Sequence, residues 1–134
     1  MRFTILFDDA FAIEFAALAD DVQDQIRAYA GVLAEFGHKL GRPFADTLKG
    51  SKFPNMKELR ITANKVEWRV AFAFDRQRRA ILLAATPKGG KKDQLIYERL
   101  IKNADARFAA HQARLTARAG KSGKSSSKGA SKKE

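Results

Sequence analysis

The chain has 134 residues, of which 45% are hydrophobic, so its length and composition predict one folded domain with a modest core. It contains no cysteine, which excludes disulfides and thiolate metal sites and favours a cytoplasmic protein. No apolar run approaches the ~20 residues of a membrane span, so no membrane partner is expected. The formal net charge of +11 favours a polyanionic partner such as nucleic acid.

The N-terminal half predicts a strand followed by two helices. Residues 1–7 have the composition of a strand, and Asp8 or Asp9 is placed to cap a helix that follows. The stretch 10–36 has a helical pattern, which Asp20 and Asp21 are expected to divide, with an Asp capping the second helix. Gly37 is expected to end that helix, and the glycines and prolines of 38–55 predict a loop.

The C-terminal half predicts three strands, a helix and a tail. Alternation of apolar and polar residues marks strands at 57–62 and 67–74, and a more uniformly apolar run marks a central strand at 80–86. A helical pattern covers 93–115. From residue 116 the chain is rich in Lys, Ser and Gly and is expected to be a disordered basic tail. The prediction is therefore an α+β domain over 1–115, with an antiparallel sheet, two N-terminal helices and a C-terminal helix.

Strand register points to a pair of facing arginines. Matching the apolar faces of the first two of these strands requires Ile61 to lie opposite either Trp68 or Val66, and the first choice gives a two-residue turn at Asn64 and Lys65. Arg60 then lies opposite Arg69, and such a like-charge pair favours a bridging anion. That anion is either a carboxylate, from Glu58 or Glu67, or a bound phosphate.

Two further features could belong to an anion site. The small side chains of Ala71, Ala73 and Ala84 predict a concave floor beside the facing arginines. The loop after the last strand contains glycine and three lysines just before a helix, where backbone N–H groups favour anions: Lys88, Lys91 and Lys92.

The usual catalytic sets are missing from the sequence. The two histidines, His38 and His111, are expected outside the sheet, which disfavours a two-histidine ribonuclease site. Acidic residues are not grouped with histidine, so no metal and no other cofactor is predicted. Chemistry would have to use Arg, Lys, Tyr or Glu, with the 2′-hydroxyl of RNA as the nucleophile.

The order of elements, together with three segments, resembles a known family. These segments are 55–60 (NMKELR), 68–75 (WRVAFAFD) and 79–83 (RAILL), and the likeness extends to about residue 115. The combination resembles the phage-derived Gp49-like, or HigB-like, branch of the RelE/ParE toxins. The resemblance implies a microbial-ribonuclease-type fold, ribosome-dependent mRNA cleavage, and neutralisation by a helix-turn-helix antitoxin that alone would contact operator DNA.

The resemblance also implies roles for individual residues. Arg69 matches the family's strand arginine, Lys57 and Arg60 its preceding basic strand, and Tyr97 its late tyrosine. The basic position after the last strand is matched by Lys88, Lys91 or Lys92. The histidines used by some HigB proteins have no evident equivalent here.

On this basis, the expected catalytic residues are Arg69, Lys88, Lys91 and Tyr97, and the expected RNA-binding residues are Lys57, Arg60 and Lys92. Glu58 is either a general base or an ion-pair partner of Arg60, and Tyr97 is equally well explained as a core residue. The alternatives to a ribonuclease are a ParE-like inhibitor of DNA gyrase that cleaves nothing, and an RNA-binding protein that has lost toxicity.

Overall fold

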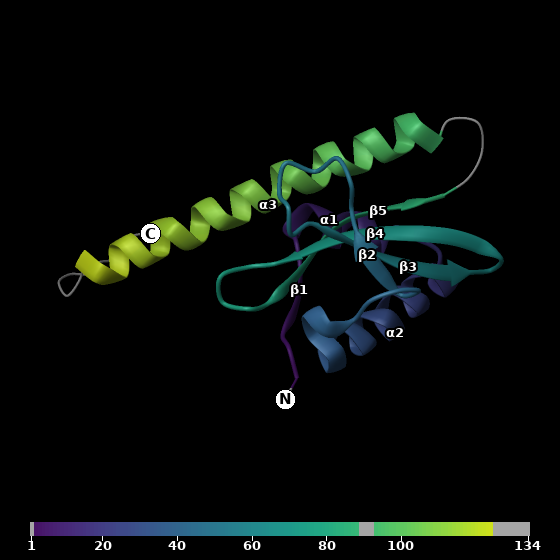
Figure 1. Cartoon of the computed structure of the whole chain (residues 1–134), viewed down its shortest axis with the longest axis horizontal. Coiled ribbons are helices and arrows are strands. Elements are labelled where there is room, and N and C mark those ends of the chain that lie inside the picture. Colours follow the sequence, from purple (N-terminus) through teal and green to yellow (C-terminus); the bar gives the residue numbers. More distant parts are fainter. Residues whose placement is uncertain (1, 89–92, 125–134) are drawn as a thin grey trace.

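The computed structural model describes residues 2–88 and 93–124, and within them the α+β prediction is confirmed (Figure 1). The elements, in chain order, are β1 (Ile5–Phe7), α1 (Asp9–Ala16), α2 (Asp20–Phe36), the 3-10 turn η1 (Gly37–Lys39), β2 (Ala45–Thr47), β3 (Lys57–Ala63), β4 (Val66–Phe74), β5 (Ala80–Pro87) and α3 (Asp93–Lys124). None of the helices in these residues is long and apolar enough to cross a bilayer.

The helix boundaries have local causes. The Asp8 carboxylate accepts a hydrogen bond from the Phe11 amide at 3.0 Å, which caps α1 as expected. Gly37 ends α2 with a φ of +59°, and a Cβ there would lie 2.1 Å from the Phe3 ring, so only glycine fits. The expected aspartate cap of α2 is wrong, because Ala19 occupies that position and both aspartates lie in the first helical turn.

The five strands form one sheet in the order β1-β5-β4-β3-β2, with β4 at its centre. The predicted register is confirmed: Ile61 pairs with Trp68 and Arg60 with Arg69, across a turn formed by Asn64 and Lys65. Both turn residues have positive φ, the geometry that suits a tight two-residue hairpin. The sheet is not wholly antiparallel, because β1 pairs parallel with β5.

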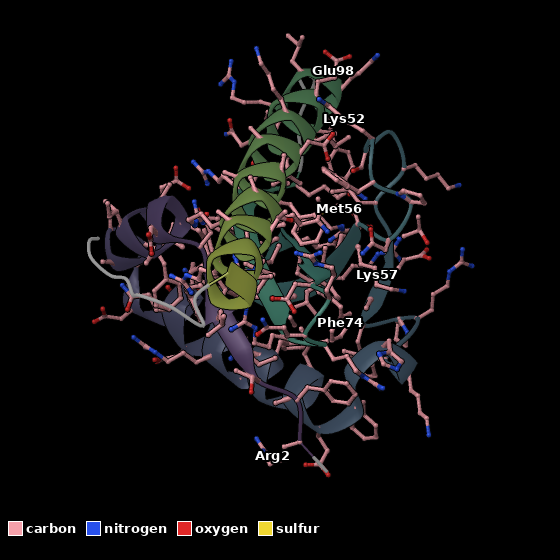
Figure 2. The ribbon with its side chains drawn as sticks, turned by 90° about the vertical axis from the view of Figure 1, so that its left-hand side faces the viewer. Arg2, Lys52, Met56, Lys57, Phe74 and Glu98 are labelled. Carbon is pink, nitrogen blue, oxygen red and sulfur yellow. The ribbon has the colours of Figure 1, made fainter. Side chains whose placement is uncertain are left out.

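Each face of the sheet is covered, as the view along α3 shows (Figure 2). Leu59, Val70 and Phe72 pack with α1 and α2 on one face. On the other face, Phe108 and its neighbours on α3 pack over the alanines of β4 and β5. The prediction of a concave floor at these alanines is therefore wrong, because Ala71, Ala73 and Ala84 are buried beneath a helix.

Two element boundaries differ from the sequence prediction. The expected loop 38–55 contains the edge strand β2, which pairs with β3 and is too short to show an alternating pattern. α3 continues to Lys124, so 116–124 are helical rather than part of the expected disordered tail. The row of buried side chains on α3 extends to Leu115, and the residues after it can extend this helix without the cost of starting a new one. The remaining tail, 125–134, lies outside the described residues.

Candidate functional site

Glu58 is the centre of the candidate site. Its side chain is 5% exposed and projects from β3 on the same face as Arg60. Glu58 Oε2 lies 3.0 Å from Arg60 Nε and 3.7 Å from Arg69 Nε, so one carboxylate bridges the two facing arginines. The ion pair expected between Glu58 and Arg60 is thus present, and a carboxylate is the anion that bridges the like-charge pair in this structure.

Arg69 is unusual for a guanidinium because its side chain is only 8% exposed. Its Nη atoms bond the Trp68 carbonyl at 3.3 Å and the Glu67 carboxylate at 3.4 Å. Its buried Nε has no hydrogen-bond partner among the described residues. A buried donor without an acceptor is costly, so this atom can gain free energy from an anion that enters the site.

Tyr97, in the second turn of α3, completes the cluster. Its hydroxyl donates a hydrogen bond to Glu58 Oε1 at 2.5 Å. Burial and this contact with the Glu58 carboxylate raise the pKa of Tyr97 to about 12. The phenol therefore stays protonated at neutral pH and acts as a hydrogen-bond donor, not as a base by itself. Tyr97 belongs to the polar cluster and also packs at the edge of the α3 core.

A cavity of about 790 Å³ opens beside this cluster. It brings together five of the residues expected from the sequence: Glu58, Arg60, Arg69, Lys88 and Tyr97. The other lining residues come from the edge strand β2 and its flanks, and from the first turns of α3: Arg42, Asp46, Thr47, Leu48, Lys49, Asp93, Gln94, Glu98 and Ile101.

Sequence reasoning missed the contribution of β2. Asp46 Oδ2 accepts hydrogen bonds from Arg42 Nε at 2.9 Å and from Arg60 Nη2 at 3.3 Å. The Thr47 backbone amide and the Arg42 guanidinium hold the pKa of Asp46 below its usual range. Arg60 is thus held between two carboxylates, Asp46 and Glu58. The only sequence signal was an isolated aspartate between Ala45 and Thr47, in a segment with the composition of a loop.

Other expected residues are not in this cluster. Lys57 lies on the opposite face of β3 from Glu58, pairs with Phe72 of β4, and does not line the cavity. Lys91 and Lys92 lie outside the described residues. Both histidines lie outside the sheet as expected, with His38 against the Phe3 and Phe74 rings and His111 on α3 beside Asp75.

The charge of the cavity is nearly balanced. Its lining holds five basic side chains (Arg42, Lys49, Arg60, Arg69 and Lys88) and four acidic ones (Asp46, Glu58, Asp93 and Glu98), a formal sum of +1. A phosphate that binds here must therefore take arginine contacts away from carboxylates. This site suits an exchange of anions more than the simple capture of one.

Comparison with known proteins places the chain in a family. Residues 13–109 match the family described as phage-derived protein Gp49-like (DUF891). Two proteins of Mycobacterium tuberculosis (strain ATCC 25618 / H37Rv) are similar. One, named "Putative toxin HigB2", is 49% identical over 63% of this chain, and the other, named "Putative toxin HigB3", is 41% identical over 57% of it.

The aligned parts cover 42% of the first relative and 65% of the second, so this chain spans less than two thirds of either protein. No solved structure shows a significant match. The family match covers α2, most of the sheet and all the described residues of the cavity. The chain belongs to the phage-derived Gp49-like family, as its resemblance to that HigB-like branch predicted.

Proposed function

We propose that this protein is the toxin of a type II toxin–antitoxin system and acts as an endoribonuclease on ribosome-bound mRNA. The names of its two relatives support the first part. The second rests on one observation: the buried Arg69, with an unsatisfied Nε donor, faces a cavity that also contains Arg60, Lys88 and Tyr97. These are the groups that metal-independent cleavage of a phosphodiester requires.

In this proposal the scissile phosphate replaces Glu58 as the partner of Arg69. Arg69 and Arg60 then hold the phosphate oxygens and stabilise the charge that grows on them as the 2′-oxygen attacks phosphorus. Lys88, at the end of β5, is exposed and lines the same cavity, so it can stabilise the 5′-oxygen as the P–O5′ bond breaks. Lys91 is proposed for the same role. Lys92 is proposed to bind RNA, and so is Lys57, on the opposite face of β3 from Glu58.

The proton of the 2′-hydroxyl needs an acceptor, and Glu58 is the carboxylate placed to receive it. Tyr97 donates a hydrogen bond to Glu58 Oε1, and both residues line the cavity. The Tyr97 hydroxyl can pass its own proton to Glu58 while it takes the proton of the 2′-hydroxyl. Without RNA, the same contacts make Glu58 the ion-pair partner of both arginines.

The decisive experiment is cleavage of a defined mRNA in a ribosome complex by the wild-type protein and by Arg69→Ala. If Arg69 stabilises the transition state, Arg69→Ala should lower the rate by about 10²–10³-fold. Arg69→Lys should restore only part of the rate, because an ammonium cannot reproduce the planar fork of a guanidinium. The control is Arg2→Ala, which removes an exposed arginine close to the N-terminus (Figure 2).

Thermal unfolding of each variant shows whether a lost rate reflects a lost fold. Absence of mRNA cleavage by the folded wild-type protein on ribosomes would reject the nuclease. Inhibition of DNA gyrase supercoiling in place of cleavage would support the ParE-like alternative.

The proposed partner is a helix-turn-helix antitoxin whose surface complements this basic chain. Co-expression of the helix-turn-helix protein encoded beside it should give a stable complex and relieve growth arrest. Separate elution of the two proteins at low salt, with arrest persisting, would rule out that partner.

A further inference from the structure

A second hollow lies far from the candidate site, under the C-terminal half of α3. Its volume is about 270 Å³, and it is bordered by β1, the beginning of β5 and one side of α3. Four of its lining side chains are arginine or histidine: Arg79, His111, Arg114 and Arg118. The β4–β5 turn passes beside it, at the end of the sheet opposite the Arg69 and Lys88 cavity (Figure 1).

This end of the molecule is firmly built. The buried Asp75 carboxylate binds Arg79 through Nε at 3.0 Å and Nη2 at 2.8 Å, and it lies 2.9 Å from His111 Nε2. Leu115 is buried, and Arg76 Nη2 donates a hydrogen bond to Thr116 Oγ1 at 3.0 Å. These contacts fix α3 to the β4–β5 turn and hold Arg76 and Arg79 in defined positions.

The arginines here differ from most others in the chain. Among the described residues, carboxylates pair with Arg2, Arg27, Arg42, Arg60, Arg69, Arg79 and Arg107. Besides Arg99, the arginines without such a partner are Arg76, Arg78, Arg114 and Arg118, all on the β4–β5 turn or the C-terminal half of α3. Unpaired guanidinium groups leave most of their donors available to another anion.

The nearby carboxylates lower this charge without removing it, because Arg79, Arg114 and Arg118 line the hollow against Asp8 and Asp9, a formal sum of +1. Asp75 is occupied by Arg79 and His111, and Asp8 caps α1 and lies 3.8 Å from Arg107. Asp9, in the first turn of α1, is the other acidic residue that lines the hollow. The exposed large apolar side chains of the described residues lie elsewhere, at Ile13, Phe36, Phe44, Val66 and Leu95. A protein interface normally has an apolar centre, so this surface suits a phosphate backbone better than a protein.

We propose that Arg76, Arg114 and Arg118 form an arginine surface that binds the phosphate backbone of RNA, separately from the cavity at Arg69. The proposal rests on the proposed function only in taking RNA as the polyanion. Arg114 and Arg118 are four residues apart and so lie on one side of α3, where they can contact neighbouring phosphates. Arg114 and Arg118 lie beyond residue 109, outside the family match, whereas Arg76 lies within it.

The test is the salt dependence of binding between the full-length protein and a labelled single-stranded RNA with 2′-O-methyl groups, which cannot be cleaved. The variant is Arg114→Gln with Arg118→Gln; both side chains are exposed, so the fold should be unaffected. Each phosphate contact on single-stranded nucleic acid contributes about 0.7 to the slope of log K against log salt. Loss of two contacts should lower the slope by about 1.4. Between about 50 and 200 mM salt, wild type should then lose about sevenfold more affinity than the variant does.

The matched control is Arg99→Gln with Lys102→Gln, which removes the same charge from exposed positions on the same helix. It should bind RNA with nearly the wild-type slope, and the lysine-rich C-terminal residues are the same in all three proteins. Equal slopes for the two double variants, or no salt-dependent binding by wild type, would overturn the arginine surface. Because no ribosome and no cleavage enter this assay, its outcome is independent of whether the Arg69 cavity is catalytic.

Discussion

Replacement of Glu58 by glutamine tests the centre of the site directly. Glu58→Gln keeps the size of the side chain and an acceptor oxygen for the Tyr97 hydroxyl, but it removes the charge that bridges Arg60 and Arg69. Two arginines that face each other across the β3–β4 pair would then lose their shared counter-ion. The structure predicts two opposite effects, a less stable fold and a site more receptive to anions.

The loss of stability can be bounded from the contacts. Removing one partner of a buried ion pair costs about 3–5 kcal/mol. Here the value should be lower, about 2–3 kcal/mol, because Arg60 is partly exposed and keeps Asp46, and Arg69 keeps Glu67. For a domain of this size that corresponds to a fall in Tm of roughly 8–12 °C.

The assay is thermal unfolding of wild type and Glu58→Gln over a series of phosphate concentrations. In the variant, Arg69 and Arg60 lack the Glu58 carboxylate, so phosphate should bind the native state more tightly than in wild type. At about ten times its Kd, phosphate would restore about 1.4 kcal/mol. Arg2→Ala, which lacks only an exposed ion pair, should show the wild-type response to phosphate. Equal melting temperatures without phosphate, or equal stabilisation of both proteins by phosphate, would refute the bridging role and the exchange of anions.

Four simpler changes test other parts of the structure. Since the pKa of Tyr97 is raised to about 12, the protonated phenol should stabilise the fold fully below pH 10, and this stabilisation should be lost as the pH rises from about 10 to 12. Tyr97→Phe should abolish this alkaline loss of stability and the tyrosinate absorbance that accompanies it. Burial raises the pKa of Asp75, but hydrogen bonds from His111 and Arg79 outweigh this effect and hold the pKa below its ordinary value of 3.8. The Asp75 carboxylate should therefore lose its stabilising effect as the pH falls below about 4, and Asp75→Asn should remove that share of the acid-induced loss of stability. Phe108→Ala should cost about 3–5 kcal/mol in urea unfolding, because the ring is fully buried between α3 and the sheet. Lys65→Gly should raise Tm slightly, since Lys65 has a φ of +67° in a turn that favours glycine.

Much of the sheet could be predicted from sequence because period-two patterns fix the register. The apolar face of Leu59 and Ile61 had to meet that of Trp68 and Val70, which left two registers, and the one with a two-residue turn placed the two arginines opposite each other. The same argument left Glu58, Glu67 or a bound phosphate as the bridging anion, and in the structure Glu58 is the bridge.

Other features depended on tertiary contacts that carry no local signal. β2 is three residues long and exists because the edge of β3 offers it hydrogen bonds, so Asp46 and Arg42 were not recognised as neighbours of Arg60. The small size of Ala71 and Ala73 indicates that another group packs closely against this face of the sheet, but it does not show whether that group is a helix or a ligand. α3 is the helix that fills that space.

The continuity of α3 sets a fixed length within the molecule. Tyr97 and Arg114 lie on one uninterrupted helix, seventeen residues apart, which corresponds to about 26 Å at 1.5 Å per residue. The helix fixes both the distance and the relative orientation of these two side chains, because each residue added or removed between them rotates the rest of the helix by about 100° and shifts it along its axis. The segment between these two residues should therefore tolerate substitution on its exposed side but neither insertion nor deletion. An RNA strand that contacts both Tyr97 and Arg114 must span that fixed distance.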